Sequence, residues 1–210
     1  RDPVRLKPQY ARRYQLAAGT EAGFIFEVFN FDFPEFGYNP DPGRERRNKA
    51  LRCAIIKTFD WEARNQSWFF GLATIFPGII VPVVPEYDPH LSRASVTRDV
   101  EGARRLLADN GWTPANLPVL VYGQTAGVKQ RMFFEQLRAE LMDIGWPQEK
   151  VVLKQYATFG DISRAWKESR LPIVAKGWGL DYPDAENTLQ LFYGPNRSPG
   201  SNDANYRNPA

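Results

Sequence analysis

The chain has 210 residues, of which 43% are hydrophobic and 14% aromatic, a composition typical of a folded globular domain with its own core. Its 27 basic and 24 acidic side chains give a net charge of +3, an imbalance too small to indicate a nucleic-acid partner. The longest apolar run, residues 75–84, is about half the roughly 20 residues that a membrane-spanning helix needs, so we predict no membrane span.

The sequence begins at Arg1 without an initiating methionine or a signal-peptide pattern, and it stops at Ala210 without a terminal signature. We therefore expect a piece of a longer protein. The single cysteine, Cys53, has no partner for an internal disulfide, and its apolar helical surroundings predict a buried structural thiol. His90 is the single histidine, and the sequence has no glycine-rich phosphate loop. Metal, nucleotide and Ser/Cys–His chemistry are therefore not expected.

The first third of the chain predicts strand, loop and helix in turn. Residues 14–31 predict one strand, possibly two, with Phe24, Phe26 and Val28 on one face. Residues 33–43 hold three prolines and two glycines, which predicts a loop. Residues 44–59 predict an amphipathic helix. Its expected buried stripe is Ala50, Leu51, Ala54, Ile55 and Phe59, and its expected solvated basic face is Arg46, Arg47, Lys49, Arg52 and Lys57.

The middle of the chain predicts two further helices around a long loop. A short helix is expected over residues 61–70, followed by an extended, proline-punctuated loop over 77–89. Thr97 is the expected N-cap of the next helix, with Asp99 and Glu101 in its first turn and a stop at Asn110-Gly111. Its expected buried stripe is Val100, Ala103, Leu106 and Leu107.

The second half alternates strands and helices. Strands are predicted over residues 119–122, 151–156 and 173–175, with helices over 127–144 and 161–168 between them. In the first of these helices, Phe133, Leu137, Leu141 and Ile144 share one face. This order predicts an α/β fold with a parallel-leaning sheet, in which ligands bind where strands end and helices begin. The segment 177–184 lies at one such exit.

Two carboxylates mark this exit. Asp184 precedes Ala-Glu-Asn-Thr-Leu and is interpreted as a helix N-cap. Asp181 follows an apolar strand and Trp178, so it is expected to be partly desolvated and able to pair with a cation. Tyr182 and two further aromatic residues nearby could form a ligand pocket with it, or the aromatic residues could be interior packing.

Several segments, in this order, resemble motifs of one known family. They are the strand end Phe29-Asn30 before a proline loop, RRNKALRCAIIKTFDWEA (46–63), TRDVEGARRLLADNGW (97–112) and GWGLDYPDAENTLQLFYGPN (177–196). The last segment resembles the family pattern W-x-x-D-Y-x-D-P, with Ala185 where the family often has proline. The chain is thus similar to the extracellular solute-binding proteins that include the dipeptide- and oligopeptide-binding components of ABC importers.

The resemblance implies an α/β fold that is one lobe of a two-lobed, periplasmic-binding-protein-like architecture, with a mixed sheet flanked by helices. Residues 1–30 would be the interlobe strand region, and residues 31–210 an incomplete C-terminal ligand-binding lobe whose partner lobe is absent. Asp181 would pair with the α-ammonium group of a ligand. Trp178, Gly179 and Tyr182 would line the same wall, and Asn30 would be a further ligand contact.

The resemblance also implies the substrate-binding component of an ABC importer, which captures a peptide-like or other small amine-bearing solute between two lobes. The expected partners are this ligand and an inner-membrane ABC permease, and we expect a periplasmic or surface-tethered monomer without cofactor or metal. Sugars, opines and nickel chelates are alternative solutes within the family. Two other classes stay open: a small hydrolase with Asp181 and Asp184 as its acid/base pair, and an interaction domain that uses the basic helix 44–59.

Overall fold

A four-stranded mixed sheet organises the computed structural model, which describes residues 5–17 and 19–207. Its strands are β1 (Gly23–Phe29), β2 (Leu120–Thr125), β3 (Val151–Tyr156) and β4 (Ile173–Gly179), in the spatial order β1-β4-β2-β3. Strand β2 runs parallel to β3 and β4, whereas β1 runs antiparallel to β4. The predicted mixed α/β architecture is therefore confirmed.

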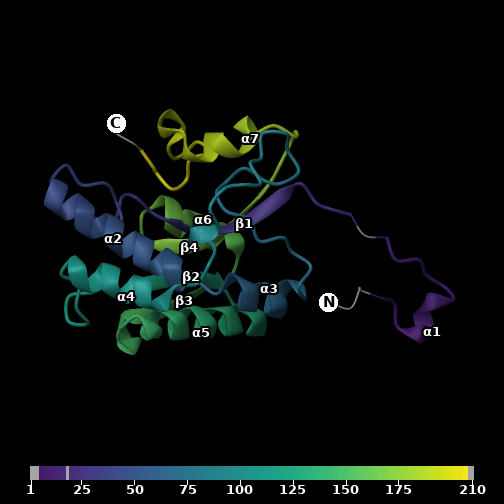
Figure 1. Cartoon of the computed structure of the whole chain (residues 1–210), viewed down its shortest axis with the longest axis horizontal. Helices are drawn as coiled ribbons and strands as arrows, with labels where there is room; N and C mark the ends of the chain where they lie inside the picture. Colours follow the sequence, from purple (N-terminus) through teal and green to yellow (C-terminus); the bar gives the residue numbers. More distant parts are fainter. Residues whose placement is uncertain (1–4, 18, 208–210) are drawn as a thin grey trace.

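Helices cover the two faces of this sheet unequally. The longer ones are α2 (Pro42–Thr58), α3 (Trp61–Phe69), α4 (Val100–Asp109), α5 (Val128–Asp143) and α6 (Phe159–Lys167). The shorter ones are α1 (Pro8–Ala11), α7 (Glu186–Leu189) and the 3₁₀ turns η1 (Arg93–Ser95), η2 (Gln148–Lys150), η3 (Gln190–Phe192) and η4 (Gly194–Asn196). Helices α2, α4 and α5 stack on one side, the C-terminal segment with α7 lies on the other, and the segment with α1 projects away from both (Figure 1).

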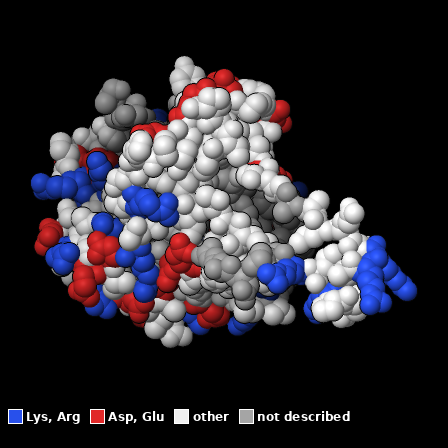
Figure 2. Space-filling view, turned by 45° about the vertical axis from the view of Figure 1, so that its right-hand side comes forward, with Lys and Arg blue, Asp and Glu red and all other residues white. Residues whose placement is uncertain are grey.

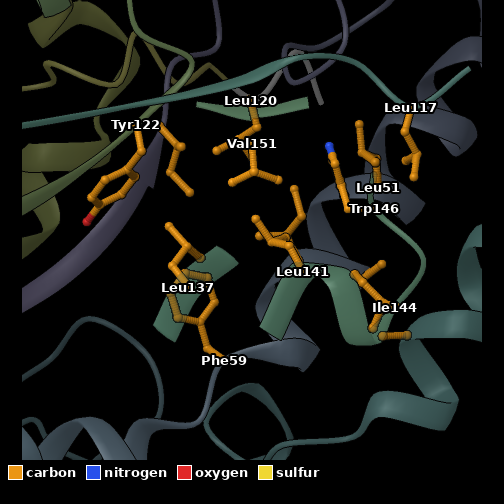
Figure 3. Packing of buried hydrophobic residues seen from close by; sticks show 14 of the residues in the cluster. Leu51, Phe59, Leu117, Leu120, Tyr122, Leu137, Leu141, Ile144, Trp146 and Val151 are labelled. Atoms are coloured by element: carbon orange, nitrogen blue, oxygen red, sulfur yellow. The ribbon is translucent and has the colours of Figure 1, made fainter. Parts of the chain in front are cut away.

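The larger core lies between the sheet and helices α2, α4 and α5. Leu51, Leu120, Leu137 and Leu141 are completely buried there, and each buried leucine contributes about 1.5–3 kcal/mol of hydrophobic stabilisation. The aliphatic side chains point toward one another, whereas Tyr122 lies at the edge of the group (Figure 3). The apolar stripes predicted for residues 44–59 and 127–144 are confirmed, because their spacing matches one face of a 3.6-residue helix.

A smaller core lies on the opposite face of the sheet, under α6 and the C-terminal segment. Trp166 is its largest buried side chain, and its indole Nε1 donates a hydrogen bond to the Asp203 carbonyl at 2.7 Å. Val28 is buried in this core and Phe26 packs against it, as the alternation in the first strand predicted. The C-terminal segment is thus held to the sheet by an apolar core and by a partly buried hydrogen bond.

The helix starts follow N-cap chemistry, with one correction. The Asp99 carboxylate accepts from the Gly102 N–H at 2.8 Å and is the N-cap of α4, whereas the predicted cap Thr97 bonds back to the Arg93 carbonyl at 2.9 Å. A cap must lie directly before the first helical turn, and α4 begins two residues later than we predicted. Gly111, with φ +71°, ends the helix as expected.

Two further predictions are corrected, and one is confirmed. The described residues of 14–31 hold one strand, β1, as predicted. Strand β4 continues to Gly179 rather than ending at residue 175. Cys53 is partly rather than fully buried.

The basic face of α2 is not simply solvated. Arg52 binds Glu45 at 2.9 Å and Lys57 binds Asp99 at 2.8 Å, while Arg47 lies 4.0 Å from the centre of the Trp112 ring. These side chains serve packing within the lobe and leave fewer charges for a partner. Among the helices that the structure describes, none is both long and apolar enough to cross a membrane.

Candidate functional site

The candidate site lies at the edge of the sheet where the parallel strands end. Strands β2, β3 and β4 run parallel, so the residues that follow them meet at this edge. Val128, Phe159 and Tyr182 begin or precede the next elements there and are 79%, 59% and 46% exposed. Three exposed apolar or aromatic side chains at the strand exits make this edge the natural place for a ligand.

Trp178 is the fixed aromatic element of this edge. It is the penultimate residue of β4, and its indole Nε1 donates to the Asn187 Oδ1 at 2.8 Å. Asn187 is completely buried in α7, so the indole orientation is set by an immobile acceptor. The hydrogen bond leaves Trp178 half-buried, with its ring beside a cavity.

The glycines beside Trp178 lie within β4 rather than in a turn. Gly177 and Gly179 are exposed on the opposite face from the indole, and the space around a Cβ built at Gly179 is open. The backbones of β1 and β4 approach each other closely at Gly23 of β1, where a Cβ would lie 2.9 Å from the Trp178 carbonyl oxygen. The sheet therefore needs glycine at Gly23, while Gly179 leaves room above the strand.

The two aspartates after β4 are both exposed. The partial desolvation predicted for Asp181 is wrong for this chain, because β4 ends two residues earlier and the carboxylate has already left the sheet. The described residues give Asp181 no hydrogen-bond or ion-pair partner. The prediction that Asp184 is the N-cap of the next helix is corrected, because Ala185 occupies the N-cap position of α7. The Asp184 Oδ1 still accepts from the Glu186 N–H at 2.8 Å, one position before that cap.

Tyr182 lies between these aspartates and points back to α7. Its hydroxyl donates a short hydrogen bond to the Glu186 carboxylate, and this bond raises the pKa of the Tyr182 hydroxyl. The ring itself stays 46% exposed. Trp178, Gly179, Asp181 and Tyr182 lie within five consecutive residues at the end of β4.

Asn30 is not part of this group. It is completely buried, its Nδ2 donates to the Trp166 carbonyl at 3.3 Å, and its Oδ1 accepts from the Asp32 N–H at 3.0 Å. Because β1 is antiparallel to β4, Phe29 lies opposite Ile173, and Asn30 lies beside the start of β4, whereas Asp181 follows its end. The prediction that Asn30 is a further ligand contact is corrected, because antiparallel pairing puts it at the other end of β4, where its side chain is buried.

A buried ion pair lies on the face of β1 opposite to Phe26 and Val28. Arg64 Nη1 donates to Glu27 Oε1 at 3.1 Å, with side-chain exposures of 5% and 7%, and the Tyr122 hydroxyl lies 3.0 Å from each carboxylate oxygen. Burial raises the pKa of Glu27, and the charge of Arg64 opposes that rise. The guanidinium also lies 3.7 Å from the centre of the Phe133 ring. This cluster fastens β1 to α3, α5 and β2.

Sequence reasoning missed a second charged pair, which lies beside Trp178. The Lys176 ammonium group donates a short hydrogen bond to the Asp203 carboxylate, and the side chains are 12% and 30% exposed. The signal was present in the alternation Lys176–Trp178, which places both side chains on one face of a strand. Ending the strand at residue 175 hid that signal.

Neither metal nor acid/base chemistry finds support in this geometry. Within the described ranges, no group of three His, Cys, Asp or Glu residues is placed to hold a metal ion. The surface seen in Figure 2 has a largely uncharged middle, with charged side chains gathered mainly around it and on the projecting N-terminal arm. An uncharged surface of this kind suits recognition of a ligand.

Comparison with known proteins decides between these possibilities. The family model described as bacterial extracellular solute-binding proteins, family 5 middle, matches residues 4–200. The chain belongs to this family. The predicted resemblance is confirmed, and family 5 is a family of solute-binding proteins rather than of enzymes. No curated protein sequence matches the chain.

Solved structures show the same fold in longer proteins. The periplasmic binding protein DppA from Helicobacter pylori, in complex with the peptide STSA, is 18% identical with a TM-score of 0.72, over 90% of this chain and 34% of that one. AppA from Bacillus subtilis with a nonapeptide is 16% identical with a TM-score of 0.67, over 90% and 37%. NikA from Staphylococcus aureus with Ni(L-His)2 is 16% identical with a TM-score of 0.66, over 90% and 36%. This family 5 chain thus spans about a third of the length of these structures.

Proposed function

We propose that this chain is the C-terminal ligand-binding lobe of a family 5 solute receptor, which captures a peptide-like, amine-bearing solute for an ABC permease. Residues 1–30 would connect to a second lobe and residues 31–210 would form one wall of the cleft. The whole receptor would act as a periplasmic or surface-tethered monomer that needs neither cofactor nor catalytic turnover. Affinity would come from closure of two lobes on the solute.

One observation carries the proposal. Asp181 presents an exposed carboxylate without a described partner, directly after the strand that holds Trp178 in place. A second lobe that closes over this edge would remove water from the carboxylate. Its charge would then be balanced best by a cation of the ligand, and a primary ammonium group fits a single carboxylate with a short charge-assisted hydrogen bond.

The alternatives have less support. As an acid/base pair, Asp181 and Asp184 would need converging carboxylates, but the Asp184 Oδ1 is engaged by the Glu186 N–H. The basic helix α2 uses several of its charges inside the lobe. The Ni(L-His)2 complex of NikA keeps a non-peptide solute as the second candidate, because that protein has the same fold.

The test measures binding affinity by calorimetric titration of the full-length natural protein and of its Asp181→Asn variant. Each protein is titrated with a tripeptide and, separately, with the same tripeptide acetylated at its N-terminus. We expect Asp181→Asn to weaken binding of the free amine by about 2–5 kcal/mol, which is about 30-fold to several thousand-fold. It should change binding of the acetylated peptide little.

Asp184→Asn is the matched control, since it lies three residues away at a helix start and should leave affinity near wild type. Equal loss in both variants, or no loss in Asp181→Asn, would refute the role of Asp181. Release of a reaction product from the tripeptide would instead favour the hydrolase.

A further inference from the structure

A small cavity of about 160 Å³ lies beside Trp178, between β4, the start of α6 and the C-terminal segment. Its walls include the rings of Phe26, Trp178 and Phe192. Phe159, which is 59% exposed at the strand-exit edge, borders the cavity on the side of the candidate site. The cavity therefore shares Trp178 with the candidate site, and Asp181 follows Trp178 by three residues in the chain.

The lining of this cavity also includes a charged pair that is not fully satisfied. The Lys176 ammonium group has three N–H donors, of which the described hydrogen bonds use one, to Asp203 Oδ2. A second can face the Trp166 ring, whose centre is 5.3 Å from the Lys176 Nζ. At least one donor is left over, and the other oxygen of Asp203 accepts no hydrogen bond from the described residues.

The charges of this pair restrict what can enter. Because Lys176 and Asp203 already neutralise each other, a charged ligand group would leave one net charge in a partly enclosed space with aromatic walls. An aliphatic group would leave the spare donor and the spare acceptor without partners. A neutral group that carries an acceptor and a donor side by side matches both.

We propose that this cavity is a side-chain subsite that recognises a primary carboxamide, as in glutamine or asparagine, on the ligand of the proposed receptor. The carboxamide oxygen accepts from Lys176, its NH2 group donates to the free oxygen of Asp203, and its flat faces pack against the rings of Phe26 and Trp178. The size fits, because 160 Å³ is the liquid volume of about five water molecules and the glutamine side chain has five non-hydrogen atoms. This subsite rests on the proposed function, since it reads a side chain of the same solute.

The experiment uses the full-length natural protein and three pairs of alanine-based tripeptides, with glutamine or methionine at the first, second or third position. Glutamine and methionine have similar length, so each pair differs mainly in hydrogen bonding. At one position we expect glutamine to bind about 10- to 100-fold more tightly than methionine, the effect of hydrogen bonds to charged groups.

Lys176→Met should abolish this preference. Ser163→Leu is the second variant, because Ser163 lines the cavity but is not a member of the ion pair, and the larger side chain reduces the space for a ligand. It should also abolish the glutamine preference while trialanine still binds, which shows that the receptor remains folded. Lys154→Met is the matched control, since Lys154 is exposed on β3 away from the cavity, and it should keep the preference.

The outcomes separate the two proposals. If the tripeptides bind but glutamine and methionine are equal at every position, the carboxamide subsite is overturned while the peptide-binding function stands. A preference that persists in both Lys176→Met and Ser163→Leu would overturn it as well. If wild type binds none of the tripeptides, the peptide-like ligand class is refuted and the subsite with it.

Discussion

The buried pair of Arg64 and Glu27 gives a sharp test of how this lobe is held together. Replacing Arg64 with methionine keeps a long apolar side chain against the Phe133 ring but removes the positive charge. Glu27 would then be a carboxylate with 7% side-chain exposure whose remaining described donor is the Tyr122 hydroxyl. An unpaired buried charge of this kind is strongly destabilising.

The expected size follows from that burial. Removing one partner of a buried ion pair costs about 3–5 kcal/mol. With a urea m-value of about 2 kcal/mol/M, Arg64→Met should lower the unfolding midpoint by roughly 2 M. The double variant Glu27→Gln/Arg64→Met should recover part of this loss, because residue 27 then carries no unpaired charge.

The loss should also depend on pH. The pKa of Glu27 is raised above its ordinary value of 4.5. Above about pH 4.5 the unfolded state therefore releases a proton that the folded state still holds on Glu27, and the contribution of Glu27 to the free energy of unfolding falls as pH rises. Without Arg64 the pKa of Glu27 rises further. The difference between wild type and Arg64→Met should therefore be small near pH 4.5 and grow toward pH 8.

Urea unfolding followed by tryptophan fluorescence, between pH 4.5 and 8, measures these differences. Arg170→Met is the control, because Arg170 pairs with Glu168 at the surface, where the two side chains are 50% and 52% exposed, and such pairs contribute at most about 1 kcal/mol. A loss below about 1 kcal/mol at pH 7 in Arg64→Met, or a loss that does not change with pH, would refute the reasoning.

Two further predictions concern the backbone. Thr158→Ala should destabilise the protein by about 1 kcal/mol, because it removes the capping box with Asp161 at the start of α6, whereas Thr158→Ser should stay near wild type; equal urea midpoints for both would contradict this. Gly37→Ala should be strongly destabilising, since the added Cβ would lie 2.1 Å from the Phe31 carbonyl oxygen. Gly179→Ala, which meets open space, should leave the thermal midpoint almost unchanged, and a similar loss in both alanine variants would show that close approach is not the cause.

Much of the fold could be predicted from local patterns. Helix α5 was predicted within one residue at each end, because Phe133, Leu137 and Leu141 repeat at helical spacing and bury one continuous stripe. Strand β3 was predicted with its observed bounds. In both elements, local periodicity and tertiary packing agree.

The length of β4 could not be predicted in this way. Lys-Gly-Trp-Gly has low strand propensity because of its glycines, yet pairing with β1 continues to Gly179 opposite Gly23. The N-cap Asp99 was misassigned because Thr97 and Asp99 are both good caps, and only packing decides where the helix begins.

The candidate site was predictable only where its residues are neighbours in sequence. Trp178 and Asp181 are three residues apart, so their proximity did not depend on topology. Placing Asn30 required the direction of β1, and pairing Lys176 with Asp203 required knowing that the C-terminal segment returns over the sheet. Contacts between residues so far apart depend on chain topology, which local periodicity does not encode.

The register between β1 and β4 limits how this site can change during evolution. Successive side chains of β4 alternate between the two faces, so the side chains of Lys176 and Trp178 line the cavity, whereas Gly177 between them lines it without a side chain. Inserting or deleting one residue in β4 before Lys176 would exchange the side chains on the two faces of the strand, and Lys176 would no longer face Asp203. We therefore expect natural variation here to proceed by substitution at positions 176 and 178, and changes in chain length to be confined to the turn after Gly179.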